Sequence, residues 1–354
     1  MMQDPNQKKC ASYISAVDLF CGAGGLSYGL RSVGIDIAAG VDLDPHSRYP
    51  FEANCSARHI CRDVSSLTVD ELRGWFGDAP VRVLAGCAPC QPFSSYSQSR
   101  KTSDERWRLL KDFGRLAVGL RPEVVTMENV LGLANRPVWH EFITTLQNAG
   151  YNVSFIEISC EYFGVPQTRK RLVLLASIFG PIIFPEPINT HAKFTVRDAI
   201  GHLPPLNAGE INAMDPLHMA SRLSVKNLKR IQGSQPGGTW RDWPLELRAR
   251  CHTRKTGETY PSVYGRMEWD RPAPTITTQC YGFGNGRFGH PGQDRAISLR
   301  EAAILQSFPP DYSFVEPGSR ITFRNVGILI GNAVPPKLGE AIGRAILNHV
   351  SNAA

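Results

Sequence analysis

Two cysteines three residues apart are the first feature of the sequence that could do chemistry. Cys87 and Cys90 stand in the stretch LAGCAPCQPFSSYSQ, residues 84–98, with a proline directly before the second cysteine. Three kinds of site fit this spacing: half of a zinc site, a redox-active pair, or one nucleophile beside a packing residue. A closed zinc site needs a second ligand pair, and the spacing of Cys55 and Cys61 does not match one. The position after a predicted strand favours Cys90 as a lone nucleophile, with Cys87 as a packing residue.

A carboxyl group and two arginines lie at the ends of other predicted strands. Glu128 and Asn129 end the stretch PEVVTMENV, whereas Arg169 and Arg171 begin a later strand. A buried carboxyl beside a nucleophile suits general acid catalysis, and the alternation of a strand sends both arginines to one face. Each observation also has a plainer interpretation. The carboxylate could cap the next helix, and the arginines could form a solvated basic edge.

A glycine-rich turn between a predicted strand and a predicted helix is the third candidate. DLFCGAGG, residues 18–25, contains Gly22 and Gly24, and Asp42 ends the next predicted strand. Glycines at such a turn let the backbone approach a ligand, and an acidic residue at about this distance meets ribose hydroxyls in dinucleotide-binding folds. Ser27 stands where the last glycine of the dinucleotide fingerprint would be, so a pyrophosphate ligand is not specially favoured. The turn therefore predicts either a nucleoside site or a purely structural connection.

These candidates require a framework of alternating strands and helices. Strands are predicted at residues 14–20, 35–44, 81–86, 122–130 and 171–177. Helices are predicted at residues 26–34, 106–120, 138–151 and 336–350. This alternation predicts an α/β fold with a doubly wound, mostly parallel sheet. Beyond about residue 185 the chain is irregular and rich in proline and glycine, which predicts a second, smaller domain with some β structure.

The basic charge of the chain is concentrated in one segment. The 354 residues carry a formal net charge of +7. Between residues 220 and 290 there are 12 Lys or Arg against 5 Asp or Glu, a local excess as large as that of the whole chain. Such a segment favours a polyanionic partner. Nine irregularly spaced cysteines, with no apolar secretory segment or membrane-spanning stretch, predict a reduced cytoplasmic location.

Together and in this order, these motifs resemble the cytosine-C5 DNA methyltransferase family of the bacterial restriction-modification type. The shared motifs are DLFCGAGG (18–25), GVDLD (40–44), GCAPCQPFS (86–94), RPEVVTMENV (121–130), QTRKRLVLLA (167–176), RPAPTITT (271–278) and GNAVPP (331–336). The resemblance implies an S-adenosylmethionine-dependent methyltransferase fold. It also implies a catalytic and cofactor-binding domain at residues 12–185 and 322–354, and a DNA-recognition domain with a hinge at residues 186–321.

The resemblance further implies roles for individual residues. Cys90 would add to C6 of a flipped-out cytosine, and Glu128 would bind its N3. Arg169 and Arg171 would hold the base O2 and the Glu128 carboxylate. The residues implied for the S-adenosylmethionine pocket are Phe20, Gly22, Gly24, Asp42, Leu43, Asp63, Leu109, Asn332 and Val334. The residues implied for contact with DNA are Gln91, Ser94, Arg241 and Arg254. No metal is implied.

The family also suggests partners, and it leaves alternatives. We expect a monomer that acts on double-stranded DNA in the bacterial nucleoid, either beside a separate cognate endonuclease or as an orphan methylase. One branch of the family methylates transfer RNA, but its Cys-Phe-Thr element is absent here. An oxidoreductase with a redox pair would lose as much from Cys87→Ser as from Cys90→Ser, whereas a methyltransferase would lose turnover only from Cys90→Ser. A catalytically dead DNA-binding protein is disfavoured by the intact Cys90, Glu128, Arg169 and Arg171.

Overall fold

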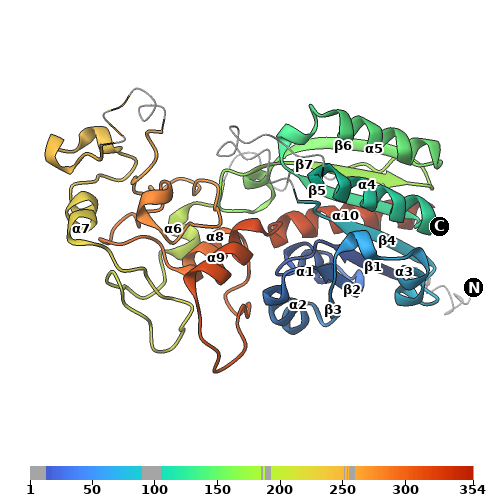
Figure 1. The fold of residues 1–354 in the computed structure, drawn as a ribbon, viewed down its shortest axis with the longest axis horizontal. Helices are drawn as coiled ribbons and strands as arrows, with labels where there is room; N and C mark the ends of the chain where they lie inside the picture. The colour runs from blue at the N-terminus through green and yellow to red at the C-terminus, as the bar shows by residue number, and fades with distance from the viewer. Residues whose placement is uncertain are drawn as a thin grey trace, which may run out of the picture.

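The computed structural model describes residues 13–89, 105–184, 186–187, 193–250, 252, 254 and 260–353. One lobe contains a seven-stranded sheet, and the other is largely irregular (Figure 1). The strands are β1 (Ile14–Leu19), β2 (Asp36–Asp42), β3 (Arg58–Cys61), β4 (Val81–Gly86), β5 (Val124–Asn129), β6 (Asn152–Ser159) and β7 (Lys170–Ser177). The α-helices are α1 (Gly25–Ser32), α2 (Arg48–Cys55), α3 (Val69–Phe76), α4 (Glu105–Leu120), α5 (Pro137–Asn148), α6 (Val196–Ile200), α7 (Val225–Gln232), α8 (Leu299–Leu305), α9 (Phe323–Asn332) and α10 (Pro336–Ala353).

The sheet is parallel except for one strand. Its order is β3-β2-β1-β4-β5-β7-β6, and β7 runs antiparallel to both β5 and β6. Residues 160–169, which connect β6 to β7, are too few for a crossover helix, so the chain has to turn back and pair antiparallel. The mostly parallel, doubly wound sheet predicted from the sequence is confirmed, with β7 as the exception.

Helices cover both faces of the sheet and complete three layers. One face packs against α1, α2 and α10 through a core that includes Leu26, Leu30, Phe51, Val83 and Ile342. The opposite face packs against α3, α4 and α5 through a core that includes Leu72, Phe113, Trp139, Leu84 and Leu174. The interior strand β1 is buried along its whole length, as expected of a strand covered on both faces. None of the helices in the described ranges has the length and hydrophobicity needed to cross a bilayer.

Two further hydrophobic clusters hold the second lobe together and connect it to α9 and the glycine turn. Helices α6, α8 and α9 share a cluster that includes Val196, Ile276, Leu305, Val326 and Ile330. A smaller cluster contains Ile231, Trp240, Trp243, Phe283 and Ala296. In the described part of residues 193–321, β pairing is limited to isolated bridges such as Pro236 with Arg266 and Gly289 with Ala296. The many prolines and glycines of this segment account for the absence of longer strands there.

Candidate active site and cofactor-binding edge

The candidate catalytic side chains meet at one edge of the sheet because β7 is antiparallel. Strands β4 and β5 are parallel neighbours, so the residues that follow their carboxyl ends lie side by side. The register of β5 with β7 pairs Asn129 with Leu172 and Glu128 with Val173. The amino end of β7 therefore lies beside the carboxyl end of β5. This arrangement brings Arg171 next to Glu128.

Glu128 is a buried carboxylate between a guanidinium and a thiol. Its side chain is 3% exposed, and its Oε1 lies 2.7 Å from Nε of Arg171. The thiol of Cys87 donates to the other oxygen, Oε2, over 3.0 Å. The pair with Arg171 is a contact of charges without a well-aligned hydrogen bond, and the buried Oε1 accepts no hydrogen bond from the described residues. This oxygen thus has acceptor capacity that a bound ligand could use.

Asn129 holds the backbone that leads toward Cys90. Its amide nitrogen Nδ2 donates to the carbonyl oxygen of Ala88 over 3.0 Å, and its Oδ1 accepts from the backbone of Val130 over 2.8 Å. The side chain is 2% exposed, so losing either bond would leave a buried polar group unpaired. Sequence reasoning assigned no such role to Asn129. The feature of the sequence that could have indicated this role is the position of Asn129 beside Glu128 at the end of a predicted strand.

The structure separates the two arginines that the sequence grouped together. Arg171 contacts the Glu128 carboxylate, whereas the guanidinium of Arg169 donates to the backbone carbonyls of Ile276, Gly331 and Ala333. Burial, followed by the positive charge of Arg171, lowers the pKa of Arg169 to about 9, which leaves it charged at neutral pH. The sequence predicted that the two arginines hold the base O2 and the Glu128 carboxylate between them. Arg171 contacts the carboxylate, and the buried Nε of Arg169 has no hydrogen-bond partner among the described residues.

Two buried glutamines complete the network around Arg169. Nε2 of Gln167 donates to Oε1 of Gln306, and its own Oε1 accepts from the backbone of Ile276. Gln306 in turn donates to the carbonyl of Ala333, which also accepts from Arg169. The strand β7, the segment around Ile276 and the end of α9 are thereby tied together. Sequence reasoning gave neither glutamine a role, because the bonds of Gln167 to Gln306 and Ile276 join positions more than 100 apart in the chain.

Three predicted site residues, Cys90, Gln91 and Ser94, lie outside the described residues. Cys87, Ala88 and Pro89, which precede them, are described. Cys87 follows β4 directly, and its backbone nitrogen donates to the carbonyl of Leu19 over 3.2 Å. Cys87 therefore lies at the same edge of the sheet that carries Glu128 and the glycine turn.

The glycine turn and Asp42 form a second group of side chains on this edge. Oδ2 of Asp42 accepts from the backbone nitrogen of Gly22 over 2.9 Å, and Oδ1 accepts from that of Asp44 over 2.8 Å. Gly24 has a φ of +89° and Phe20, unusually for a residue with a side chain, a φ of +62°. Glycine adopts a positive φ freely, whereas for Phe20 it costs free energy, and such strain concentrates at ligand sites. Space is open around Gly22 where a side chain would stand, so the turn has room for a ligand.

The other predicted cofactor residues lie around this turn. Leu43 is 65% exposed, and Asp63 begins the short helix Val64–Ser66 by accepting from the backbone of Ser65 over 2.8 Å. Val334 is buried, and a side chain at Gly25 would collide with its carbonyl oxygen. The remaining two are the exposed Asn332, at the end of α9, and the half-buried Leu109, in α4. An exposed apolar residue next to a carboxylate and an open glycine turn suits an adenine and a ribose.

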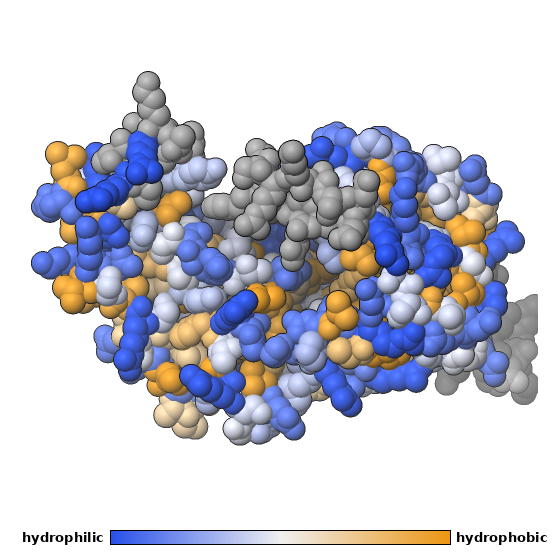
Figure 2. Space-filling view, in the orientation of Figure 1, coloured by the Kyte–Doolittle hydropathy of each residue, from blue (hydrophilic) through white to orange (hydrophobic). Residues whose placement is uncertain are grey.

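Several of the basic residues of the second lobe are internal. Arg230 packs over the rings of Trp243 and Tyr264, and Arg266 donates to several backbone carbonyls while buried. Arg248 donates to the carbonyl of Trp243. Arg241 and Arg254, in contrast, are exposed. Figure 2 shows many hydrophilic residues on the surface of this lobe, at the left of the view. Part of the basic excess thus builds the lobe, whereas Arg241 and Arg254 lie at its surface.

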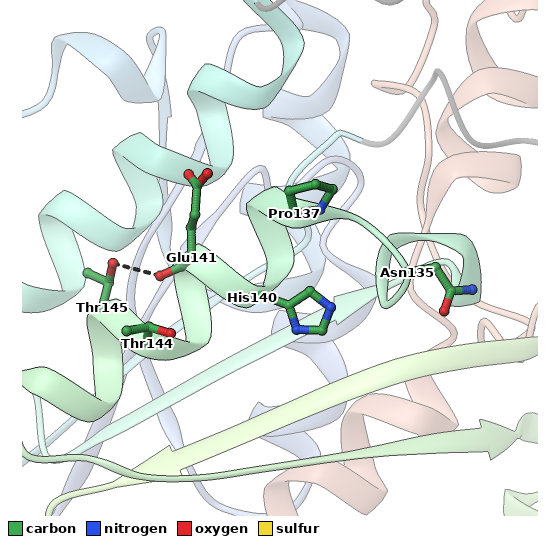
Figure 3. A pocket seen from close by; sticks show the side chains of 6 residues that line it. All are labelled: Asn135, Pro137, His140, Glu141, Thr144 and Thr145. Atoms are coloured by element: carbon green, nitrogen blue, oxygen red, sulfur yellow. Dashed lines mark hydrogen bonds between the residues drawn. The ribbon is translucent and has the colours of Figure 1, made fainter.

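A hollow on the outside of α5 lies apart from these groups. It is lined by Asn135, Pro137, His140, Glu141, Thr144 and Thr145 (Figure 3). These side chains come from successive turns of one helix and from the residues before it, and the hydroxyl of Thr145 donates to the carbonyl of Glu141. None of the predicted catalytic or cofactor residues lines this hollow.

Comparison with solved structures identifies the class of fold. A protein encoded within an E. coli prophage, proposed to be a DNA modification methyltransferase, has a TM-score of 0.74 at 21% identity and covers 96% of this chain and 99% of its own. The Dnmt2 methyltransferase of S. pombe has a TM-score of 0.59 at 18% identity, with coverage of 96% and 98%. The fold is therefore that of an S-adenosylmethionine-dependent methyltransferase.

Comparison of sequences identifies the family. The family model described as C-5 cytosine-specific DNA methylase matches residues 14–348. The Type II methylase M.HgiDII of Herpetosiphon aurantiacus is 48% identical over 336 residues, which are 94% of this chain and 94% of that protein. The Type II methyltransferase M1.HphI of Haemophilus parahaemolyticus is 34% identical, with coverage of 96% and 88%. The chain belongs to the C-5 cytosine-specific DNA methylase family. It is a DNA cytosine-5 methyltransferase, and S-adenosylmethionine is its methyl donor.

Proposed function

We propose that Cys90, Glu128 and Arg171, with Arg169 beside them, form the catalytic centre, which methylates C5 of a cytosine flipped out of double-stranded DNA. The main observation that supports this assignment is the environment of the Glu128 carboxylate. Its carboxylate is buried at a strand end, and its Oε1 lies 2.7 Å from Arg171 yet accepts no hydrogen bond from the described residues. A cytosine N3 that carries a proton is a donor suited to this oxygen.

C5 of cytosine is too weak a nucleophile to attack the methyl donor by itself. An enzyme nucleophile must first add to C6, which makes C5 electron-rich. Addition of the Cys90 thiolate forms a bond from sulfur to C6 and moves the electron pair of the C5–C6 double bond to C5. Glu128 holds a proton at N3, which neutralises the charge that the addition creates in the ring. Arg171 keeps the carboxylate in place. After methyl transfer, a base removes the C5 proton, the sulfur–C6 bond breaks and the double bond is restored.

The glycine turn and its surroundings form the proposed cofactor site. Asp42 holds the ribose hydroxyls, Leu43 packs against the adenine and Asp63 accepts from its amino group. Phe20, Gly22 and Gly24 line the turn, while Leu109, Asn332 and Val334 complete the pocket. S-adenosylmethionine supplies an electrophilic methyl group when it is bound there. The positive φ of Phe20, the open space at Gly22 and the exposure of Leu43 support this placement.

The second lobe is the proposed DNA-recognition domain, at residues 186–321, with the catalytic domain at 12–185 and 322–354. The basic excess between residues 220 and 290 and the exposure of Arg241 and Arg254 support contact with a polyanion. Gln91 and Ser94 contact DNA from the catalytic side. Flipping the target base costs a few kcal/mol, which contacts in the pocket offset.

The biological setting that we propose is a type II restriction-modification system. The support is the similarity to M.HgiDII and M1.HphI, which are type II enzymes. The chain would act as a monomer in the bacterial cytoplasm and nucleoid, with a cognate endonuclease as a separate protein.

Two measurements test the proposed function. Mapping 5-methylcytosine in DNA from cells that express the chain identifies the target sequence. A duplex with 5-fluorocytosine at that position should then form an adduct that survives denaturation, because fluorine at C5 cannot leave as a proton does. The adduct should require S-adenosylmethionine and be absent in Cys90→Ser. Methylation of DNA without any such adduct, or an adduct that persists in Cys90→Ser, would refute the role of Cys90.

A further inference from the structure

Cys87 occupies a fixed position against the proposed catalytic carboxylate. The strands β4 and β5 pair Gly86 with Met127, so the residues that follow, Cys87 and Glu128, lie opposite each other. The backbone of Cys87 is anchored by the hydrogen bond to Leu19, and its thiol reaches Oε2 of Glu128 at 3.0 Å. A partly buried thiol this close to a carboxylate oxygen acts as the donor of a hydrogen bond.

The two oxygens of Glu128 have different surroundings as a result. Oε2 faces the thiol of Cys87, whereas Oε1 faces the guanidinium of Arg171 and has acceptor capacity left. A carboxylate that can rotate about its last bond would exchange the two oxygens. A donor on Oε2 opposes that rotation, because the bond would be lost in the buried site without replacement by water.

We propose that Cys87 is a positioning residue for Glu128: its thiol holds Oε2, so that Oε1 faces N3 of the target cytosine. This inference rests on the role proposed above for Glu128. It replaces the interpretation of Cys87 as a packing residue, and it differs from a redox partnership with Cys90, because the group that matters is the S–H donor. A hydroxyl at the same position retains a donor, whereas a methyl group does not.

The three interpretations predict different orders of activity among variants. If Cys87 only packs, Cys87→Ala should be tolerated at least as well as Cys87→Ser, because alanine brings no polar group into a partly buried place. If Cys87 is a redox partner, both variants should be as inactive as Cys90→Ser. If Cys87 positions Glu128, Cys87→Ser should keep most of the methyl-transfer rate and Cys87→Ala should lose about fivefold, the effect of one modest hydrogen bond.

The test is the single-turnover rate of methyl transfer with the full chain, at saturating target duplex and S-adenosylmethionine. We expect a lower rate constant for Cys87→Ala with unchanged half-saturating concentrations of both substrates, and rescue by Cys87→Ser. In an E128Q background, Cys87→Ala should cause no further loss, because the carboxylate that it positions is gone. Cys280→Ala, which removes a buried sulfur from the core of the second lobe, serves as the matched control.

The outcomes also separate this inference from the proposed function. Full activity of E128Q would overturn the role of Glu128 itself. An inactive E128Q together with a fully active Cys87→Ala would overturn only the positioning role. A loss in Cys87→Ala that Cys87→Ser does not rescue, or that persists undiminished in E128Q, would also overturn it. Urea denaturation of each variant shows whether a loss of rate reflects unfolding.

Discussion

The hydroxyl of Ser27 donates a hydrogen bond of 2.7 Å to Oδ2 of Asp18, and both side chains are buried. Asp18 lies on β1 and Ser27 on α1, so this bond closes the base of the glycine turn between them. Burial raises the pKa of Asp18 to about 7, although the bond from Ser27 opposes the rise. The serine at the position of the fingerprint's last glycine thus has a structural role.

Replacing Asp18 by Asn is expected to remove a pH dependence from the free energy of unfolding. In the unfolded chain this carboxyl ionises near its usual pKa, whereas in the folded protein it stays protonated up to about pH 7. The folded state therefore loses stability as the pH rises between these values, by about 1.4 kcal/mol for each unit of pKa difference. Urea denaturation at pH 5 and pH 8 measures this loss, which should be smaller by a few kcal/mol in D18N.

The exposed Asp36 on the neighbouring strand β2 provides the control. D36N should keep the pH dependence of the wild type. An equal loss of stability between pH 5 and pH 8 in the wild type and D18N would show that Asp18 is already ionised in the folded state.

The location of the candidate site could be predicted from the sequence because strand ends collect at one edge of a parallel sheet. The stretches that end in Glu128 and Asp42 were apolar and β-branched enough to mark their strands, and the glycines marked the turn. The antiparallel direction of β7 was not predicted. It depends on the shortness of the connection at residues 160–169. The strand β6 was not recognised, because polar and apolar residues are mixed along it and most of it is not buried.

The contacts of individual side chains were less predictable. Alternation placed Arg169 and Arg171 on one face, but it could not show that carbonyls of Ile276 and Ala333 lie within reach of Arg169. Those partners come from segments more than 100 positions away, whose approach depends on the packing of the whole molecule. For the same reason, the basic segment did not reveal that Arg266 is internal.

The substitutions R169K and R171K should affect different properties. Lysine keeps the positive charge but lacks the planar guanidinium group. It therefore cannot donate hydrogen bonds to the carbonyls of Ile276, Gly331 and Ala333 at the same time. R169K should lower the free energy of unfolding by about 2 kcal/mol. R171K should change stability less and reduce turnover about tenfold or more, because Glu128 loses its fixed partner. Urea denaturation and the rate of methyl transfer, measured on both variants, test this difference. It would be contradicted if R169K and R171K changed stability equally and turnover equally.

Glu301 and Arg295 form a buried pair whose disruption should destabilise the second lobe. Two hydrogen bonds of 2.7 Å join the side chains, and both residues are at most 1% exposed. E301Q leaves the guanidinium without its counter-charge and should cost about 3 kcal/mol in urea denaturation. The exposed pair of Arg197 with Asp270 is the matched control, since D270N should leave the midpoint of unfolding almost unchanged. Similar shifts for E301Q and D270N would show that burial is not the deciding factor.

Arg241 and Arg254 should contribute to DNA binding through phosphate contacts. Both are exposed on the second lobe, and the guanidinium of Arg241 lies 5.5 Å from the ring centre of Trp240, which orients it. Removing one phosphate contact should reduce the slope of log affinity against log salt by about 0.9 and weaken binding to target and non-target duplexes alike. Equilibrium binding of R241A and R254A at several salt concentrations measures both effects. Arg31, at the far end of α1 from the glycine turn, is the control, because R31A should leave the slope unchanged. A loss confined to the target duplex would instead identify the arginine as a base-reading residue.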